Sequence, residues 1–348
     1  MIEIDGSQGE GGGQVLRTSL ALSLLTQQPF RIERIRAGRD QPGLRPQHLE
    51  CVRAAMRISR AAVTGDRVGS QSLVFSPGPV VPGAYEFHIG TAGAVTLVVQ
   101  TVLLPLLRAR GLSLLTVTGG THVPWSPTVD YLEHVFLRSL EATGYPRVAV
   151  EVPFAGYYPK GGGEVKLALP EWDSGGLTPL RRETRGTVAR VRAISATSSL
   201  PQHVSDRQSG RAETRLRGMD LPHEVERRVY ASRQPGTSVL LVAETDGGPM
   251  GATALGSRGK PAERVADEAC DELERTLSRE GAVDLHLADQ LLLPLALVDG
   301  ESSFTATEVT LHLLTVVDVV RAFHPVEIVV DGREGEPGRV VIRGRSLR

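Results

Sequence analysis

The chain has 348 residues, a length that allows two or three domains, and its formal net charge of -1 gives no global basic field for nucleic acid. Hydrophobic residues at 41% and charged residues at 23% are ordinary for a globular protein. The only cysteines, Cys51 and Cys270, make neither a disulfide framework nor a zinc site, which favours a reducing cytoplasm. The longest apolar stretch, residues 94–107, is broken by Gln100 and Pro105, so no membrane span is expected.

A glycine-rich segment follows the first predicted strand, residues 1–5. Its sequence is GSQGEGGGQ, at positions 6–14, and a helix is predicted over residues 15–26. Glycines at such a junction let backbone N–H groups approach a ligand, and the helix N-terminus favours an anion. The segment is neither a Walker loop nor the dinucleotide fingerprint, because the required residues and spacing are absent. A tight turn is the alternative, but Glu10 inside it is placed to hold a divalent metal beside phosphate.

A loop rich in arginine comes next, between a predicted strand over residues 30–36 and a helix over residues 46–60. It carries Arg36, Arg39 and Arg45 within ten positions. Arginine forks separated by glycines form a phosphate clamp in one interpretation and a solvated basic loop in the other.

The rest of the first half continues this alternation of strands and glycine-opened helices. Strands are predicted over residues 61–77, 84–89, 112–118, 147–152 and 164–169, and helices over residues 94–108 and 128–143. Gln100 is the one amide in an apolar helix, where a polar side chain usually has a partner or lines a site. A strand–helix–strand unit recurs near residues 1–75, 84–118, 114–169 and 289–343, without a fixed sequence period.

The composition changes near Arg182, and residues 184–280 are interpreted as an inserted α+β domain large enough for its own core. Strands are predicted there over residues 187–196, 236–245 and 250–256, and helices over residues 206–218, 223–233 and 261–279. Its histidines are isolated and it has no Cys-x-x-Cys pair, so no chemistry is assigned to it. The chain then divides into residues 1–183 of the body, the insert, and residues 281–348 of the body.

After the insert, an apolar helix opened by Asp289 and Gln290 is predicted, then a strand over residues 305–309 and a helix over residues 311–323. His312 lies in the first turn of that last helix. The helix macrodipole disfavours an imidazolium there, so the ring stays neutral and nucleophilic, and the same helix end attracts phosphate. A neutral histidine facing phosphate can attack phosphorus and form a phosphoramidate. Taken alone, a packed or capping histidine is the commoner case.

In order and spacing, these segments together resemble the RNA 3′-terminal phosphate cyclase family over nearly the whole chain. The segments are DGSQGEGGGQVLR, RAGRDQPGLRPQHL, the helix around Gln100, LADQL and TLHLLT. The resemblance implies an α+β body of repeated β-α-β units, related to enolpyruvyl transferases, with a small inserted domain of thioredoxin-like arrangement and no redox motif. It implies a ligase-type enzyme of RNA processing that uses ATP and Mg²⁺ or Mn²⁺ to convert an RNA 3′-terminal phosphate into a 2′,3′-cyclic phosphate.

The resemblance also implies roles for individual residues. His312 matches the histidine that is adenylylated; AMP then passes to the RNA 3′-phosphate, and the adjacent 2′-OH displaces it. Glu10 matches the metal ligand. The expected contacts to the terminal phosphate and to ATP phosphates are Arg17, Arg36, Arg39, Gln47 and His48. The expected nucleotide contacts are Gln100, His286, Asp289 and Gln290, with His286 standing where the family commonly has Tyr.

Three other functions share parts of this pattern. A catalytically inactive cyclase-like protein of ribosome assembly would lack the nucleophile, and the presence of His312 and Glu10 argues against it. An enolpyruvyl transferase relies on lysines as well as arginines, and this chain has no lysine before Lys160 or after Lys260. A broader adenylyltransferase for nucleic-acid ends would share the first two chemical steps and stays open, as does a homodimer.

Overall fold

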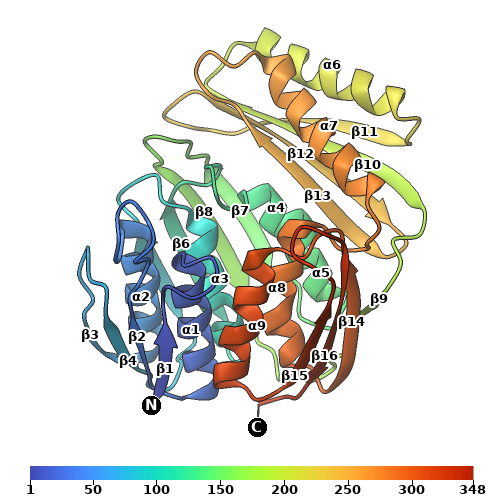
Figure 1. Ribbon diagram of the computed structural model, residues 1–348. Helices are drawn as coiled ribbons and strands as arrows, with labels where there is room; N and C mark the ends of the chain where they lie inside the picture. The colour runs from blue at the N-terminus through green and yellow to red at the C-terminus, as the bar shows by residue number, and fades with distance from the viewer. Residues whose placement is uncertain (348) are drawn as a thin grey trace.

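Three units of the body follow one chain order: strand, helix, strand, helix, and a closing antiparallel strand pair (Figure 1). The structure is a computed structural model that describes residues 1–347. The first unit comprises β1 (Ile2–Asp5), α1 (Gly13–Thr26), β2 (Phe30–Glu33), α2 (Pro46–Ser59), β3 (Ala62–Thr64) and β4 (Leu73–Ser76). The second comprises β5 (Ala84–His88), α3 (Val95–Leu107), β6 (Ser113–Gly119), a helix made of α4 (Val129–Tyr131), a π-helical turn (Leu132–Leu137) and α5 (Arg138–Glu141), then β7 (Ala149–Phe154) and β8 (Gly163–Leu169). The third comprises β9 (Arg181–Arg182), α8 (Leu285–Ala296), β14 (Gly300–Ala306), α9 (Leu311–Phe323), β15 (Glu327–Asp331) and β16 (Gly338–Gly344).

The sheet of each unit has the same topology. The strand orders are β1-β2-β4-β3, β5-β6-β8-β7 and β9-β14-β16-β15, with the first two strands parallel and the others antiparallel. A parallel pair needs a crossover, and a helix supplies it in each unit. The sequence analysis expected four overlapping units, but the structure has three. The difference arises because each unit contains two strand–helix steps. Residues 84–118 and 114–169 are the two halves of the second unit.

The helices of the three units pack against one another in the middle of the body, and the sheets lie around them (Figure 1). Helix α1 contacts α2, α3 and α9, and α8 contacts α9. Helix α3 is apolar on almost every side, as a helix surrounded by others must be. One hydrophobic core runs through all three units. The expected α+β fold is confirmed. Among residues 1–347, no helix is long and apolar enough to cross a membrane.

An inserted unit interrupts the third repeat between β9 and α8. It comprises β10 (Val188–Ser198), α6 (Gln202–Gly218), β11 (His223–Val229), β12 (Gly236–Thr245), β13 (Gly248–Leu255) and α7 (Ala262–Ser278). Its sheet has the order β11-β10-β12-β13, and both helices lie on the face turned away from the body (Figure 1). A separate cluster of buried residues, including Leu241 and Leu273, forms its core.

Three secondary-structure predictions need correction. Residues 223–233, predicted as a helix, contain strand β11, because parallel pairing with β10 supplies backbone partners from Val191 onward. The segment HEVERRV has too few apolar residues to distinguish the two periodicities. Residues 61–77 form two strands, β3 and β4, separated by a loop that begins at Gly65 with φ +91°. The strand predicted over residues 305–309 lies earlier, as β14, where it pairs with β16 along its whole length.

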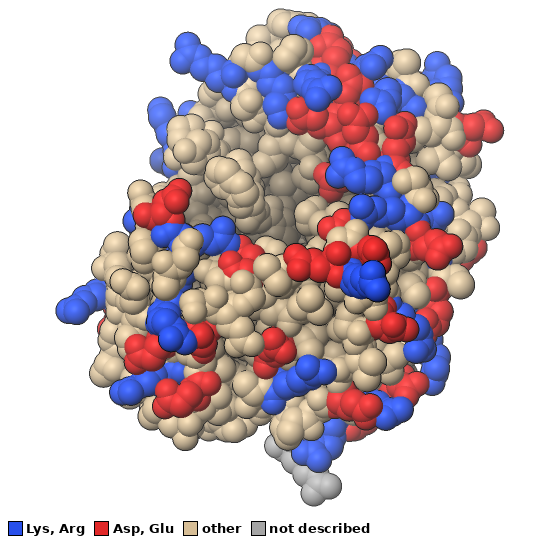
Figure 2. Space-filling model, viewed as in Figure 1, with Lys and Arg blue, Asp and Glu red and all other residues tan. Residues whose placement is uncertain are grey.

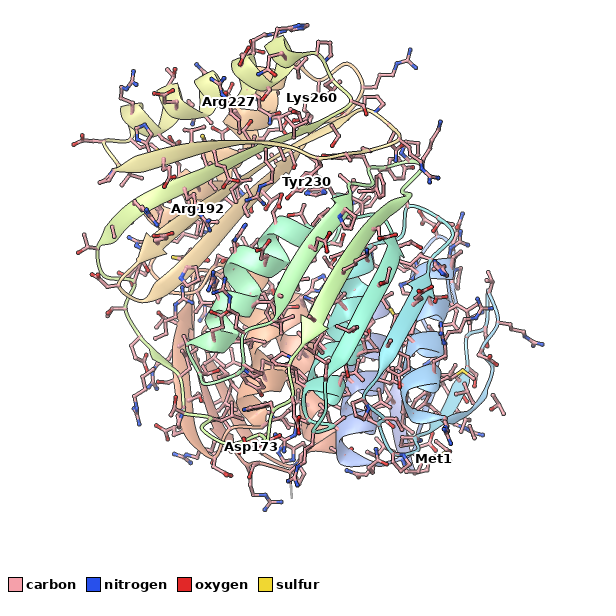
Figure 3. The ribbon with its side chains drawn as sticks, turned by 180° about the vertical axis from the view of Figure 1, so that it is seen from behind. Met1, Asp173, Arg192, Arg227, Tyr230 and Lys260 are labelled. Atoms are coloured by element: carbon pink, nitrogen blue, oxygen red, sulfur yellow. The ribbon has the colours of Figure 1, made fainter. Side chains whose placement is uncertain are left out.

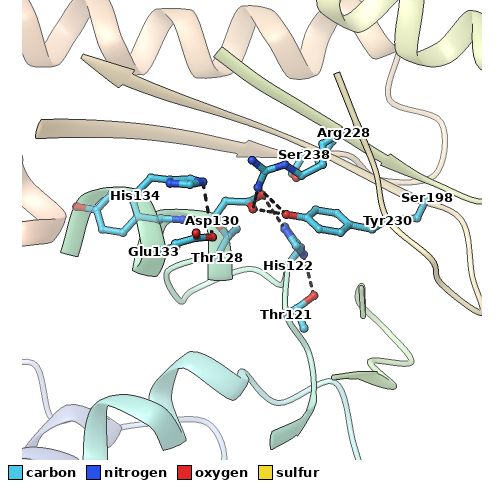
Figure 4. Close-up of polar contacts among 12 residues, drawn as sticks. Thr121, His122, Thr128, Asp130, Glu133, His134, Ser198, Arg228, Tyr230 and Ser238 are labelled. Atoms are coloured by element: carbon cyan, nitrogen blue, oxygen red, sulfur yellow. Dashed lines mark hydrogen bonds and ion pairs between the residues drawn. The ribbon is translucent and has the colours of Figure 1, made fainter. Parts of the chain in front are cut away.

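A buried polar network joins the insert to the body (Figure 4), and one of its members, Tyr230, is labelled between the two parts in Figure 3. The Asp130 carboxylate accepts hydrogen bonds from Arg228 Nη1 at 3.1 Å and from the Tyr230 hydroxyl, both in the insert. His122 Nε2 lies 3.0 Å from the other carboxylate oxygen, and Thr121 Oγ1 lies 2.7 Å from His122 Nδ1. Burial alone would raise the pKa of Asp130, but these donors outweigh it and hold the pKa below its usual value. The carboxylate is therefore ionised and ties the two parts of the chain together.

Candidate active site

A cavity of about 960 Å³ opens between the insert and the body, where Figure 2 shows the surface hollowed. Its walls come from the N-terminal ends of α1, α2 and α9, from α3 and α8, and from the loop after β6. Every residue predicted to belong to the site lines this one cavity: Glu10, Arg17, Arg36, Arg39, Gln47, His48, Gln100, His286, Asp289, Gln290 and His312. Side chains up to three hundred positions apart therefore meet in one place.

His312 occupies the first turn of α9, two positions after the cap residue Thr310, whose hydroxyl accepts from the Leu313 N–H at 3.1 Å. Its side chain is half-exposed to the cavity. Burial lowers the pKa of His312 below the ordinary 6.5, and the charges of Arg17 and Arg39 lower it further against the opposing effect of Asp289. The ring is consequently neutral at pH 7, as a nucleophile requires.

Gln14, in the first turn of α1, bridges His312 and Asp289, and the sequence analysis did not single it out. Its amide nitrogen donates to the Asp289 carboxylate, which leaves its amide oxygen facing His312 Nδ1. An amide oxygen only accepts, so Nδ1 must carry the proton of the neutral ring. The lone pair then resides on Nε2. Burial raises the pKa of Asp289, while its contact with Gln14 opposes this change.

Glu10 lies on the glycine loop next to the unprotonated nitrogen of His312. One carboxylate oxygen is 3.9 Å from His312 Nε2, and the same carboxylate pairs with Arg39. The loop is fastened to α9, because the Glu10 N–H donates to Thr315 Oγ1 at 3.1 Å. Gly9 makes this approach possible: its φ is +59°, and a Cβ there would lie 2.1 Å from the Thr315 hydroxyl.

The donor set around Glu10 limits how a metal could be held. Among residues 1–347 no group of three or more His, Cys, Asp or Glu side chains forms a metal site. Mg²⁺ is commonly held by one or two carboxylates together with phosphate oxygens and water. A single carboxylate beside a phosphate-binding cavity fits a metal that arrives with its phosphates.

Two arginine side chains that have no carboxylate partner, Arg17 and Arg36, line the cavity near Gly13. Arg17 is partly buried, and within the described chain its guanidinium makes no hydrogen bond or ion pair. Burial lowers the pKa of Arg17, and also that of Arg36, whose Nη1 donates only to the carbonyls of Gln41 and Gly43, at 2.7 and 3.0 Å. A cation that is partly removed from water and has no counter-charge is stabilised when an anion binds to it. This corner of the cavity, the anion corner, is therefore suited to bind an anion.

His48 contributes a neutral donor to the same corner. Its Nδ1 accepts from the Arg45 N–H at 3.2 Å, which caps α2 and leaves the proton on Nε2. Burial, with Arg17 and Arg36 nearby, lowers the pKa of His48 to about 3, so it is uncharged at pH 7. The Nε2–H group faces Gly13, where an added Cβ would lie 2.2 Å from Nε2. Only glycine leaves room for this donor at the start of α1.

Two amides and a histidine form the opposite end of the cavity. Gln100 Nε2 donates to Gln290 Oε1 at 2.6 Å, joining α3 to α8. His286 Nε2 lies 3.2 Å from a Glu272 carboxylate oxygen. Burial alone would lower the pKa of His286, but Glu272 and the other nearby acids outweigh it and raise the pKa. His286 is thus more readily charged than an isolated histidine.

The insert takes part in this cavity, although no chemistry was assigned to it from the sequence. The end of β13, the edge strand of the insert's sheet, lines the cavity, together with Glu268 and Glu272 of α7, which packs on that strand. Lys260 Nζ donates to Glu268 at 2.7 Å and to the Leu255 carbonyl at 2.9 Å. Its contribution was missed because none of these residues belongs to a recognisable motif.

The cavity of this three-repeat α+β body brings together a neutral histidine with a free Nε2, a single carboxylate and the anion corner. These groups suit a class of proteins that bind phosphorylated ligands. The comparison with known families is more specific. The family model described as RNA 3′-terminal phosphate cyclase matches residues 8–330, and the chain belongs to that family.

Curated relatives agree along the full length. The chain is 47% identical to the RNA 3′-terminal phosphate cyclase of Thermococcus gammatolerans over 97% of both chains. It is 44% identical to the protein of that name from Methanopyrus kandleri, over 99% of both, and 44% identical to the one from Nostoc punctiforme, over 95% of this chain and 96% of the other. Among solved structures, the enolpyruvyl transferase NikO from Streptomyces tendae aligns with 99% of this chain and 48% of its own, at 12% identity and a TM-score of 0.33, which is too low to bear on function.

Proposed function

We propose that this protein is an ATP-dependent RNA 3′-terminal phosphate cyclase that acts through a covalent AMP on His312. Family membership gives the reaction class. The observation that carries the assignment of the nucleophile is the Gln14 bridge, which places the proton of the neutral ring on Nδ1 and the lone pair on Nε2. The neutral state follows from the lowered pKa of His312.

Each proposed step balances its bonds. His312 Nε2 attacks the α-phosphorus of ATP, a P–N bond forms, and pyrophosphate leaves with the electrons of the broken P–O bond. An oxygen of the RNA 3′-phosphate then attacks the same phosphorus, which releases the histidine and yields RNA joined through a 3′,5′-diphosphate to adenosine. Finally the 2′-OH attacks the activated 3′-phosphorus, loses its proton, and displaces AMP.

The last step explains why ATP is used. A phosphate monoester dianion is a poor electrophile, and AMP converts one of its oxygens into a good leaving group. The attacking 2′-OH belongs to the same ribose, so closure is intramolecular, an advantage that reaches about 10⁵–10⁸ M in effective concentration. The protein has to bind phosphates, supply one nucleophile and hold the terminus in place.

The cavity supplies groups for each of these tasks. The proposed contacts to the two sets of phosphates are Arg17, Arg36, Arg39, Gln47 and His48, and the proposed nucleotide contacts are Gln100, His286, Asp289 and Gln290. Arg39 pairs with Glu10, so we expect arriving phosphate to draw the guanidinium away and free the carboxylate. Mg²⁺ or Mn²⁺ held by Glu10 would neutralise charge on the phosphates of ATP. Two buried free cysteines support a cytoplasmic location.

The test uses ATP labelled at the α-phosphate, followed by RNA ending in a 3′-phosphate. Wild-type protein should form an acid-labile protein–AMP adduct and then convert the RNA ends to 2′,3′-cyclic phosphate. His312→Ala should form no adduct, because no other neutral nitrogen replaces Nε2. The matched control, His203→Ala, removes an exposed histidine of the insert and should label like wild type.

Two results would contradict the proposal. Labelling of His312→Ala at the wild-type level would show that another residue is the nucleophile. An adduct that forms while RNA ends stay unchanged would favour the broader adenylyltransferase over the cyclase.

A further inference from the structure

Trp125 is the most exposed large hydrophobic residue of the described chain, at 92% of its surface. It lies on the loop after β6 and lines the cavity that contains His312. Leaving an indole ring in water forgoes the hydrophobic stabilisation of its burial, and tryptophan is highly buried on average. An exposed aromatic at the edge of a ligand cavity therefore indicates a contact that the isolated chain does not make.

The Trp125 loop is held in place. The Ser126 hydroxyl donates to the Val123 carbonyl at 3.2 Å, and the Thr96 hydroxyl donates to the Pro127 carbonyl at 2.8 Å. Trp125 itself has a φ of +62°, a conformation that a bulky residue rarely adopts and that persists only when its surroundings impose it. The backbone that carries the Trp125 ring is thus restrained, although the ring itself is exposed.

The charge distribution indicates which part of a ligand would meet this ring. The protein has a formal net charge of -1, and two of its cations that have no carboxylate partner, Arg17 and Arg36, lie in the anion corner. On the insert's side of the cavity, Lys260 is already paired with Glu268. The two arginines suit the phosphates at the RNA terminus, and the strand that leaves the cavity needs a further contact. Base stacking on an aromatic ring is the other sequence-tolerant contact that proteins make with single strands.

We propose that Trp125 is a stacking platform for a nucleobase of the substrate RNA, in one of the nucleotides just before the 3′ end. The inference rests on the proposed cyclase function. The residues proposed to contact ATP line the cavity, whereas an RNA strand must continue out through its mouth. An exposed ring at that mouth meets the polymer.

Fluorescence gives a direct readout, because the chain has two tryptophans, Trp125 and Trp172. Trp172 packs on Tyr145, with ring centroids 5.3 Å apart, away from the cavity. In Trp172→Phe, Trp125 is the only indole, and RNA with a 3′-phosphate should quench its emission as a base stacks on it. In Trp125→Phe the same RNA should leave the emission unchanged. Quenching in Trp125→Phe but not in Trp172→Phe would overturn the proposal.

Kinetics separate the RNA contact from the nucleotide contact. One stacked base contributes about 1–3 kcal/mol, which corresponds to roughly 5- to 140-fold in affinity. Trp125→Ala should raise the KM for RNA within that range, and Trp125→Phe by less, since a phenyl ring still stacks. Protein–AMP formation without RNA should change less than twofold. The matched control, Phe154→Ala, removes an aromatic that is 43% exposed on β7 and does not line the cavity, so its KM for RNA should stay at the wild-type value.

The remaining outcomes decide against the proposal. An unchanged KM for RNA in Trp125→Ala would exclude stacking. A fall in protein–AMP formation equal to the fall in cyclisation would place the ring against the nucleotide. A loss of self-association in sedimentation, with RNA binding intact, would make Trp125 a contact between two copies of the chain. Absence of cyclisation by wild-type protein would instead refute the proposed function itself.

Discussion

A hydrogen bond at Nδ1 of His312 leaves the other ring nitrogen, Nε2, as the reactive one. Gln14 accepts from Nδ1, and Gln14 is itself oriented by donating to Asp289. Asp289 therefore acts on His312 in two ways. It orients the Gln14 amide, which determines the tautomer of the ring. Its negative charge also raises the pKa of His312, an effect opposite to that of burial. These two effects are separable by substitution, because asparagine keeps an acceptor for Gln14 but removes the charge.

The pH dependence of adenylylation tests this separation. The reaction needs neutral His312, so its rate falls as pH drops through the pKa of that group. Because the pKa is lowered from 6.5, we expect the acid limb of the wild type below pH 6.5. Asp289→Asn removes the effect that raises the pKa, so the limb should move to still lower pH. The measurement is the single-turnover rate of protein–AMP formation at saturating ATP between pH 4.5 and 8, roughly the range in which histidine titrates.

Gln14→Leu supplies the contrast for that experiment. It abolishes control of the tautomer, and we expect a loss of about 10–100-fold at every pH, the size seen when the hydrogen-bond partner behind a metal-binding histidine is removed. A profile of Asp289→Asn that coincides with the wild type, or one shifted to higher pH, would contradict the assigned electrostatics.

Helix α9 places His312 by being anchored at its other end. Phe323, its last residue, packs edge to face on Phe30, with ring centroids 5.6 Å apart and planes at 72°; Phe30 in turn contacts Phe75. The third unit is thereby packed on the first, which provides Gln14 and Glu10. The geometry of the site depends on this aromatic cluster although none of its members approaches a ligand.

Phe323→Ala should therefore destabilise the protein by about 3–5 kcal/mol, the usual effect of removing a buried phenyl ring. Denaturation by urea, followed by circular dichroism, measures the free energy of unfolding. Phe154→Ala is the matched control: that ring is 43% exposed, and its removal should cost less than about 1 kcal/mol. Equal effects of the two substitutions would show that the Phe30–Phe323 contact does not hold the units together.

A helix or strand was predicted correctly where its identity depends on residues close to it in the sequence. The helices of the body were predicted from local patterns, and they are present as α1, α2, α3, α8 and α9. Helix α8 begins at Leu285, before the predicted start at Asp289, because the Asp284 side chain caps it. Strand β11 was predicted as a helix because its identity depends on pairing with β10, which no local pattern expresses. The predicted number of repeats was wrong for a related reason. A strand followed by a helix is visible in the local sequence pattern, but the sheet to which that strand belongs is not.

The whole molecule depends on the contact between insert and body, since the cavity lies between them. Asp130 is the centre of that contact, and its pKa is lowered below the usual 3.8. A lowered pKa contributes stability that is present above the unfolded value and is lost as pH falls through the folded value. The junction should thus be intact at pH 7 and weaken only below about pH 4.

Asp130→Asn should destabilise the protein by about 3–5 kcal/mol at pH 7, because Arg228 loses its buried counter-charge. Thermal melting at pH 7 and pH 3 is the measurement. The difference between the two melting temperatures should be smaller in the variant than in wild type. Asp331→Asn, at an exposed aspartate on β15, should leave that difference unchanged. A variant with the wild-type difference would show that Asp130 does not carry the acid sensitivity.

The sequence by itself determined the family, the α+β class and the set of residues that meet in the cavity. These come from short motifs, in which the spacing of a few residues carries the chemistry. Only the tertiary structure decided that Gln14 joins Asp289 to His312, that the repeats number three, and that the insert lines the cavity. The physical reason is distance along the chain: Gln14 finds its two partners 275 and 298 positions away. Hydrogen bonds between residues so far apart depend on how the helices pack. The sequence around each of these residues does not show that packing.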